Sequence, residues 1–144
     1  MAGSSVTFTY DDGGDGIGLT GSIRQVIIDW VSDSATGAAS GTSHKIVGTL
    51  IKAVTIPGAG GSAPTDNYDI TLSDGNVTDF LANCKTGLAN RDTANTEEVY
   101  FFLVDQDSSP LSLAARPVVC DTLAVAISNA GNTKTGRIIL YYRR

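Results

Sequence analysis

The sequence predicts an all-β fold, an antiparallel β-sandwich or jelly roll of about eight strands with one short helix. Runs of β-branched and aromatic residues recur at fairly even spacing, separated by turn-forming Gly, Asn, Asp and Ser. The residues that dominate helical bundles are scarce, because only 17% of the 144 residues are charged and there is one Met. No segment has the length and period of the helices that connect parallel strands.

The first half of the chain contains three predicted strands. Residues 5–11 alternate apolar and polar side chains, which is typical of a half-buried strand. Residues 22–31 are too densely apolar for simple alternation, so they indicate a central strand covered on both faces. Residues 32–43, rich in Ser, Ala, Gly and Thr, predict an exposed loop. The β-branched run 44–56 predicts a long strand that Pro57 ends, because proline donates no ladder hydrogen bond.

The second half predicts shorter strands and the only helix. Residues 76–84 predict a helix of about two turns, with Asn76 or Thr78 as the N-cap and Asp79 near its positive end. Residues 129–133 predict the turn of a C-terminal hairpin. The strands predicted in this half are 68–72, 98–104, 117–119, 123–127 and 135–143.

A chain of this length is expected to fold as a single domain with one core. We therefore expect one β-sandwich domain over residues 1–144, with residues 1–5 as a flexible N-terminal arm. The alternation within the predicted strands selects the expected core residues. They are Phe8, Ile27, Trp30, Leu50, Ile70, Phe101, Val125 and Ile139.

The charge and the first residues of the chain argue against several classes of function. The net charge is −5 and the sequence pI is about 4.6, whereas a protein that neutralises phosphates carries a basic face, so no nucleic-acid partner is expected. The apolar runs fall far short of the roughly 20 residues that span a bilayer, so no membrane partner is expected. The first residues have no basic and no apolar region typical of a signal peptide, so we expect none, and we expect Cys84 and Cys120 to be two reduced thiols. A single bridge between them is the alternative.

No pattern in the sequence predicts a reaction centre, so we expect no enzymatic activity, no catalytic residue, no cofactor and no small-molecule substrate. His44 is the only histidine, and a nucleophilic pair with Cys84 or Cys120 has no flanking motif to support it. A surface or strand-edge histidine is the simpler interpretation. Glu97 and Glu98 are consecutive in a predicted strand, so they point to opposite faces and cannot act as an acid–base pair.

One acidic segment has the beginning of a calcium-binding loop. Asp11, Asp12 and Asp15 supply hard oxygen ligands on a glycine-rich turn. However, Ser22 stands where the bidentate Glu of such a loop belongs. We therefore interpret this segment as a solvated acidic turn and expect no metal site.

Three segments resemble recurring segments of small virion proteins of tailed bacteriophages. They are residues 64–72 (PTDNYDITL), 87–92 (GLANRD) and 128–132 (SNAGN), the last followed by a strand that ends in Tyr141-Tyr142-Arg143. The resemblance covers most of the chain from residue 22 onward. The family that it indicates is that of the capsid decoration proteins, or cement proteins, of the β-sandwich type.

The resemblance implies a viral structural protein on the outer surface of the virion, made in the host cytoplasm. Such proteins bind the major capsid protein, commonly as homotrimers, and have no catalytic residues. Binding only to the expanded shell would stabilise that state by mass action. The expected capsid contacts are the N-terminal arm and the low-charge loops 32–43 and 58–66. The expected trimer-facing surface consists of strand edges and of Tyr141 and Tyr142 near the chain end.

Two other classes of function fit the same composition. A phage tail, baseplate or neck component would share the fold and the lack of a reaction centre. A carbohydrate-binding module would present exposed aromatic side chains on one patch, whereas Trp30 lies within an apolar run and is expected to be buried.

Overall fold

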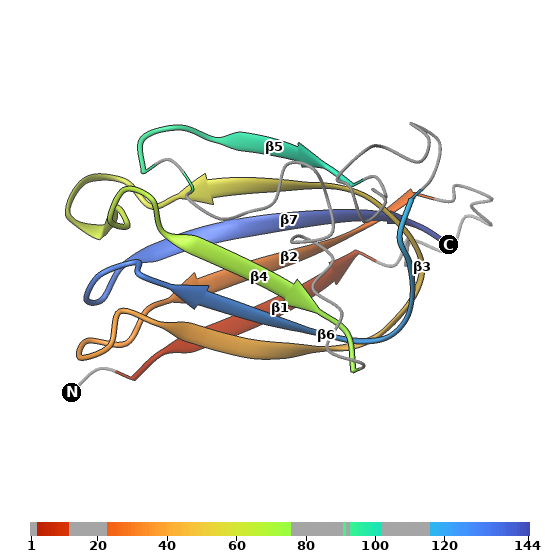
Figure 1. Ribbon diagram of the computed structural model, residues 1–144, viewed down its shortest axis with the longest axis horizontal. Helices are drawn as coiled ribbons and strands as arrows, with labels where there is room; N and C mark the ends of the chain where they lie inside the picture. Colours follow the sequence, from red (N-terminus) through yellow and green to blue (C-terminus); the bar gives the residue numbers. More distant parts are fainter. Residues whose placement is uncertain (1–2, 12–22, 76–90, 92, 102–115) are drawn as a thin grey trace, which may run out of the picture.

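The computed structural model describes residues 3–11, 23–75, 91, 93–101 and 116–144 (Figure 1). Within these residues the chain forms seven antiparallel strands and one 3-10 turn, Gly60–Ser62. The predicted all-β, antiparallel fold is confirmed, with seven strands described where about eight were expected. The helix predicted over 76–84 lies outside the described residues. The strands are β1 (Ser5–Asp11), β2 (Ile23–Val31), β3 (Ala39–Pro57), β4 (Asp69–Ser73), β5 (Glu97–Tyr100), β6 (Val118–Ser128) and β7 (Thr135–Arg143).

The longest strand, β3, belongs to both layers of the sandwich. Its first half, from Ala39 to Thr49, pairs with β6, and its second half, from Thr49 to Pro57, pairs with β7. One layer therefore has the order β1-β2-β7-β3-β5 and the other the order β3-β6-β4 (Figure 1). A Cβ at Gly48, beside the bend, would collide with the carbonyl oxygen of Arg143, so the bend requires glycine there.

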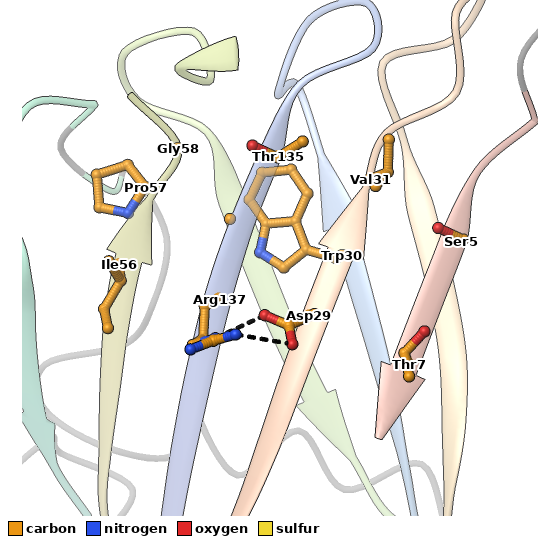
Figure 2. Close-up of a pocket in the computed structure, with 11 residues that line it drawn as sticks. Ser5, Thr7, Asp29, Trp30, Val31, Ile56, Pro57, Gly58, Thr135 and Arg137 are labelled. Carbon is orange, nitrogen blue, oxygen red and sulfur yellow. Dashed lines mark hydrogen bonds and ion pairs between the residues drawn. The ribbon is translucent and has the colours of Figure 1, made fainter. Parts of the chain in front are cut away.

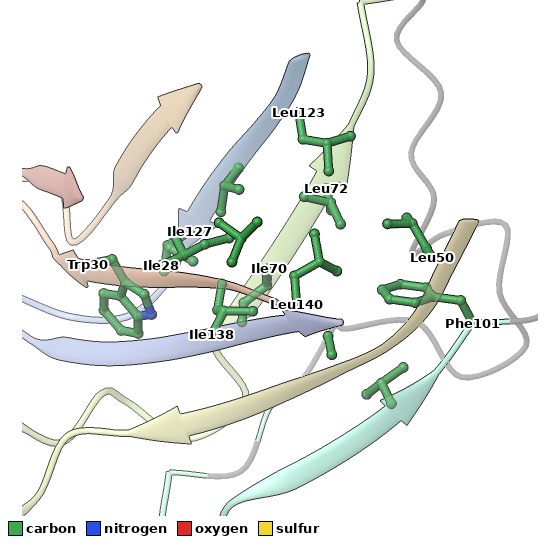
Figure 3. Packing of buried hydrophobic residues seen from close by; sticks show 14 of the residues in the cluster. Ile28, Trp30, Leu50, Ile70, Leu72, Phe101, Leu123, Ile127, Ile138 and Leu140 are labelled. Atoms are coloured by element: carbon green, nitrogen blue, oxygen red, sulfur yellow. The ribbon is translucent and has the colours of Figure 1, made fainter. Parts of the chain in front are cut away.

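The hydrophobic core lies between the two layers. Ile28 of β2 and Leu140 of β7 face Ile127 of β6 across it (Figure 3). The indole ring of Trp30 contacts the ring of Tyr68, with centroids 5.7 Å apart. Five of the eight expected core residues are fully buried, and Phe8 packs partly buried against them. The five are Trp30, Leu50, Ile70, Phe101 and Val125.

Ile27 and Ile139 are corrections to the expected core. Their strand neighbours Ile28 and Ile138 are buried, so the period of two places Ile27 and Ile139 on the opposite, solvent-facing side of the layer. Both are only partly buried there. The prediction that residues 22–31 are covered on both faces is therefore wrong, and these apolar side chains form part of the surface.

The predicted C-terminal hairpin is also wrong. β6 pairs with β3 and β4, whereas β7 pairs with β2 and β3, so residues 129–133 cross from one layer to the other. Asn129, Gly131 and Thr133 have positive φ values of 58°, 85° and 54°, which shape this crossing. Ser32 holds it, because its hydroxyl donates to the Gly131 carbonyl at 2.6 Å and accepts from the Lys134 N–H at 2.8 Å.

Three segment boundaries differ from the sequence prediction. The expected exposed loop 32–43 contains the first residues of β3, and Ser32 and Ser43 are buried. The Ser43 hydroxyl accepts a hydrogen bond from the N–H of Leu123 at 2.9 Å, beside a bulge in β3. This contact lets β6 continue through polar residues that were expected to separate two short strands. The expected N-terminal arm ends before Ser5, because Ser5 pairs with Val31.

The loop after β2 provides a pH-dependent contact. The carboxylate of Asp33 accepts the N–H groups of Ala35 and Thr36 at 2.8 and 2.9 Å, and these bonds lower the pKa of Asp33 below its ordinary value of 3.8. A depressed carboxyl pKa adds stability that is present above the unfolded pKa and is lost as the pH falls through the folded pKa. In Asp33→Asn we therefore expect a smaller loss of melting temperature between pH 7 and about pH 3 than in the wild type. Equal losses in the two proteins would show that Asp33 carries none of the acid sensitivity.

Candidate interaction surface

The solvent-facing side of the β1-β2-β7-β3-β5 layer, here called the outer face, carries an apolar row. Ile27 pairs with Ile139, and Ile139 pairs with Val54, so the three side chains lie side by side across three strands. All three are partly exposed. Isolated apolar residues on a protein surface are ordinary, whereas a contiguous row in the middle of a sheet marks a surface suited to contact.

A second row lies beside the apolar row and is aromatic and polar. Gln25, Tyr141, Lys52 and Tyr100 are register neighbours across β2, β7, β3 and β5. The Lys52 ammonium lies 5.2 Å from the ring centroid of Tyr141 and 5.6 Å from that of Tyr100. Tyr100 is 47% exposed. Tyrosine in such a position offers an apolar ring and a hydroxyl to a partner.

The charged side chains of the outer face neutralise one another. Lys52 donates to Glu98 at 2.8 Å, and this bond raises the pKa of Lys52 and lowers that of Glu98, which also accepts from Tyr100. Arg137 forms two hydrogen bonds to Asp29, at 2.6 and 3.1 Å, which raise the pKa of Arg137. Exposed pairs of this kind add little to stability, but they leave the surface without net charge at these positions.

The outer face is hollowed at one end (Figure 2). The hollow has a volume of about 430 Å³ and lies between Ile56 and Pro57 on one side and Thr7 of β1 on the other. The Asp29–Arg137 pair lies between them (Figure 2). The apolar row and this hollow therefore belong to one continuous surface.

The side chains for which no catalytic role was expected, those of His44, Glu97 and Glu98, make structural contacts. His44 is exposed, its ring stacks on that of Tyr10 with centroids 4.8 Å apart, and its backbone N–H donates to the Tyr10 hydroxyl at 2.6 Å. The interpretation as a surface histidine is confirmed. Glu98 bonds Lys52 whereas Glu97 lies 3.5 Å from Arg91, so the two glutamates serve different partners, as strand alternation predicts.

Only part of the acidic segment 11–15 belongs to the described residues. Asp12, Asp15 and Ser22 lie outside the described residues, and Asp11 ends β1. Among the residues that are described, no group of three or more His, Cys, Asp or Glu side chains could hold a metal ion. The described part of the chain also contains no helix with the length and apolar character needed to cross a membrane.

Cys120 is a free, exposed thiol on β6, whereas Cys84 lies outside the described residues. We expect the native protein to react with a thiol reagent at Cys120 without denaturation, because the side chain is accessible. Cys120→Ser should lose that reaction and keep the melting temperature within about 2 °C, since exposed substitutions change stability little. A native wild-type protein that shows no accessible thiol would contradict this assignment.

Two of the regions expected to make contacts differ from that expectation in burial or in their hydrogen bonds. Tyr142 is buried, so of the two terminal tyrosines only Tyr141 belongs to the outer face. The loop 58–66 is tied to the rest of the fold, because the Thr65 N–H donates to the Ala130 carbonyl and the Lys134 ammonium donates to the Gly61 carbonyl. Lys52, Tyr100 and Val54 were not predicted as surface residues from the sequence, because only strand register brings them together.

Comparison of the chain with protein-family models, curated proteins and solved structures finds no match.

Proposed function

We propose that the chain is a viral structural protein that decorates and stabilises a phage head by binding the major capsid protein. The observation that carries the proposal is the outer face, where an apolar row, two tyrosines and neutralised charges form one broad surface. Interface centres combine aromatic and apolar residues with few unpaired charges. The resemblance to decoration proteins is the reason for proposing the major capsid protein as the partner and the outer surface of the capsid as the location.

In this proposal the protein acts as a homotrimer. A closed three-fold oligomer matches the local three-fold positions of a symmetric shell with identical contacts on each protomer. Light scattering of the purified protein is therefore expected to give three times the protomer mass of 14.9 kDa. A monomer at all accessible concentrations would remove the trimer from the proposal.

Head binding tests the function itself. The purified protein is mixed with expanded, undecorated heads of the phage that encodes it, and also with the isolated tails of that phage. We expect it to sediment with the heads and not with the tails. Sedimentation with tails alone would instead support the tail, baseplate or neck alternative.

A carbohydrate-binding function is the second candidate, and one observation favours it. Tyr100 and Tyr141 lie on one face with polar side chains between them, which is how a protein presents rings for stacking on sugars. Host-cell polysaccharide is therefore the third binding partner to test. The carbohydrate-binding function would replace the capsid proposal if the protein binds the polysaccharide, if Tyr100→Ala abolishes this binding, and if the wild-type protein does not sediment with heads.

A further inference from the structure

Two strands pair with Thr49 at the corner where β3 passes from one layer to the other. Thr49 pairs with Arg143 of β7 and with Val118 of β6, and Arg143 also pairs with Ile23 of β2. This corner lies at the end of the sandwich where the chain terminates (Figure 1). It is separate from the apolar row of the outer face, which crosses the middle of β2, β7 and β3.

The corner contains a small pocket of about 230 Å³, lined by Thr49, Ile51, Arg116 and Arg143. Sites for whole small molecules are typically about 300–1,000 Å³. The pocket is therefore of a size for one side chain or one small anion, and both of its charged lining residues are arginines.

Neither arginine is neutralised by a carboxylate within the described part of the chain. Arg116 donates from Nη1 to the carbonyl oxygens of Ile51 and Phe101, at 2.9 and 2.7 Å, which fixes its guanidinium plane and leaves Nε and Nη2 without a hydrogen-bond partner among the described residues. The described ion pairs involve other cations, the side chains of Lys52, Arg91 and Arg137. In a chain with a net charge of −5, two arginines that have no carboxylate partner among the described residues create a local site for an anion at this pocket.

Exposed apolar residues lie beside the residues that line the pocket, and they are here called its rim. Ile23 is 62% exposed and Val118 is 71% exposed, and both are register neighbours of the row through Thr49. Val47, two residues before Thr49 on β3, is 45% exposed. An anion that brings apolar neighbours with it satisfies both the arginines and this rim, whereas free phosphate or nucleic acid satisfies only the arginines.

We propose that this pocket binds the carboxylate of an aspartate or glutamate side chain that belongs to an apolar segment of a partner protein. The carboxylate accepts hydrogen bonds from Arg116 and Arg143, in the paired geometry that guanidinium groups form with carboxylates. Apolar side chains on either side of that residue pack on Ile23 and Val118. The inference goes beyond the proposed function, because it stands on the pocket and holds whichever protein is the partner.

Two capped peptides, Leu-Glu-Leu and Leu-Gln-Leu, test the inference on the full-length protein by NMR titration. They have the same shape and differ only in the charge of the central side chain. We expect the Glu peptide to bind about tenfold or more tightly than the Gln peptide and to shift the Nε–Hε signals of Arg116 and Arg143. Equal affinities for the two peptides would overturn the proposal.

A pair of variants separates the pocket from net charge. Arg143→Gln removes the charge of a residue that lines the pocket. Arg144→Gln removes the same charge from the next residue in the chain, which does not line the pocket. We expect the first variant to lose the preference for the Glu peptide and the second to keep it within about twofold. Equal effects of both variants would overturn the proposal.

Inorganic phosphate is the third probe. If phosphate displaces the Glu peptide at concentrations where acetate does not, the pocket is a phosphate site and the proposal is wrong. If either variant fails to fold, the comparison of the two peptides on the wild-type protein decides alone. None of these outcomes bears on head binding, so failure here and failure of the proposed function are distinguishable.

Discussion

Replacing Gly136 with valine is expected to lower the free energy of unfolding by about 3 kcal/mol or more. Gly136 pairs with Trp30 in the β2–β7 ladder, and the indole covers the position that a side chain would occupy. An added Cβ would collide with the edge of the indole ring and would lie 2.7 Å from Cε2 of Trp30. Because Trp30 is 2% exposed and contacts Tyr68, the ring cannot move without opening the core.

Urea unfolding followed by tryptophan fluorescence measures this effect, since Trp30 is the only tryptophan. Gly61→Val is the matched control, because a Cβ at Gly61 meets no atom within 4 Å. We expect the control to change the free energy of unfolding by no more than about 0.5 kcal/mol. A Gly136→Val protein with the wild-type urea midpoint would mean that the indole does not pack on this strand.

Replacing Ile139 with glutamate is expected to weaken binding to expanded heads by about 30-fold or more, with the fold preserved. Ile139 is the middle residue of the apolar row, between Ile27 and Val54 on the central strand of the layer. A carboxylate there would be desolvated in the complex without a partner, since the neighbouring cations Lys52 and Arg137 are already paired. The side chain is partly exposed in the free protein, so the cost to folding is only about 1 kcal/mol.

Ala126→Glu is the matched control for this variant. It makes the same change of charge on a central strand, but on the exposed face of the other layer. Sedimentation with heads should therefore resemble that of the wild type. If Ala126→Glu loses head binding and Ile139→Glu keeps it, the docking surface lies on the β3-β6-β4 layer instead.

Much of the local structure could be predicted from the sequence, because alternation along a strand is a local property. The bounds of β1 agree with the prediction, and Pro57 is the last residue of β3. The burial of Trp30, Ile70 and Phe101 also followed from local patterns. These features depend on a residue and its immediate neighbours, which the sequence displays directly.

The errors in the sequence prediction concern which strands are paired and which face of a strand is buried. The pattern at Ile27 and Ile139 shows two apolar faces, and only the packed structure tells which face is covered. The turn at 129–133 has the composition of a hairpin turn, yet Ser32, about a hundred positions earlier in the chain, holds it across the two layers. Long-range contacts of this kind leave no local signal, so the outer face could not be assembled from the sequence.

Electron cryo-microscopy of expanded heads saturated with the protein tests the central claim most directly, namely that the outer face docks on the capsid. We predict density for three copies around each occupied local three-fold position, with the apolar row of Ile27, Ile139 and Val54 buried against the major capsid protein. Heads without added density, or density in which this row faces solvent, would contradict the account.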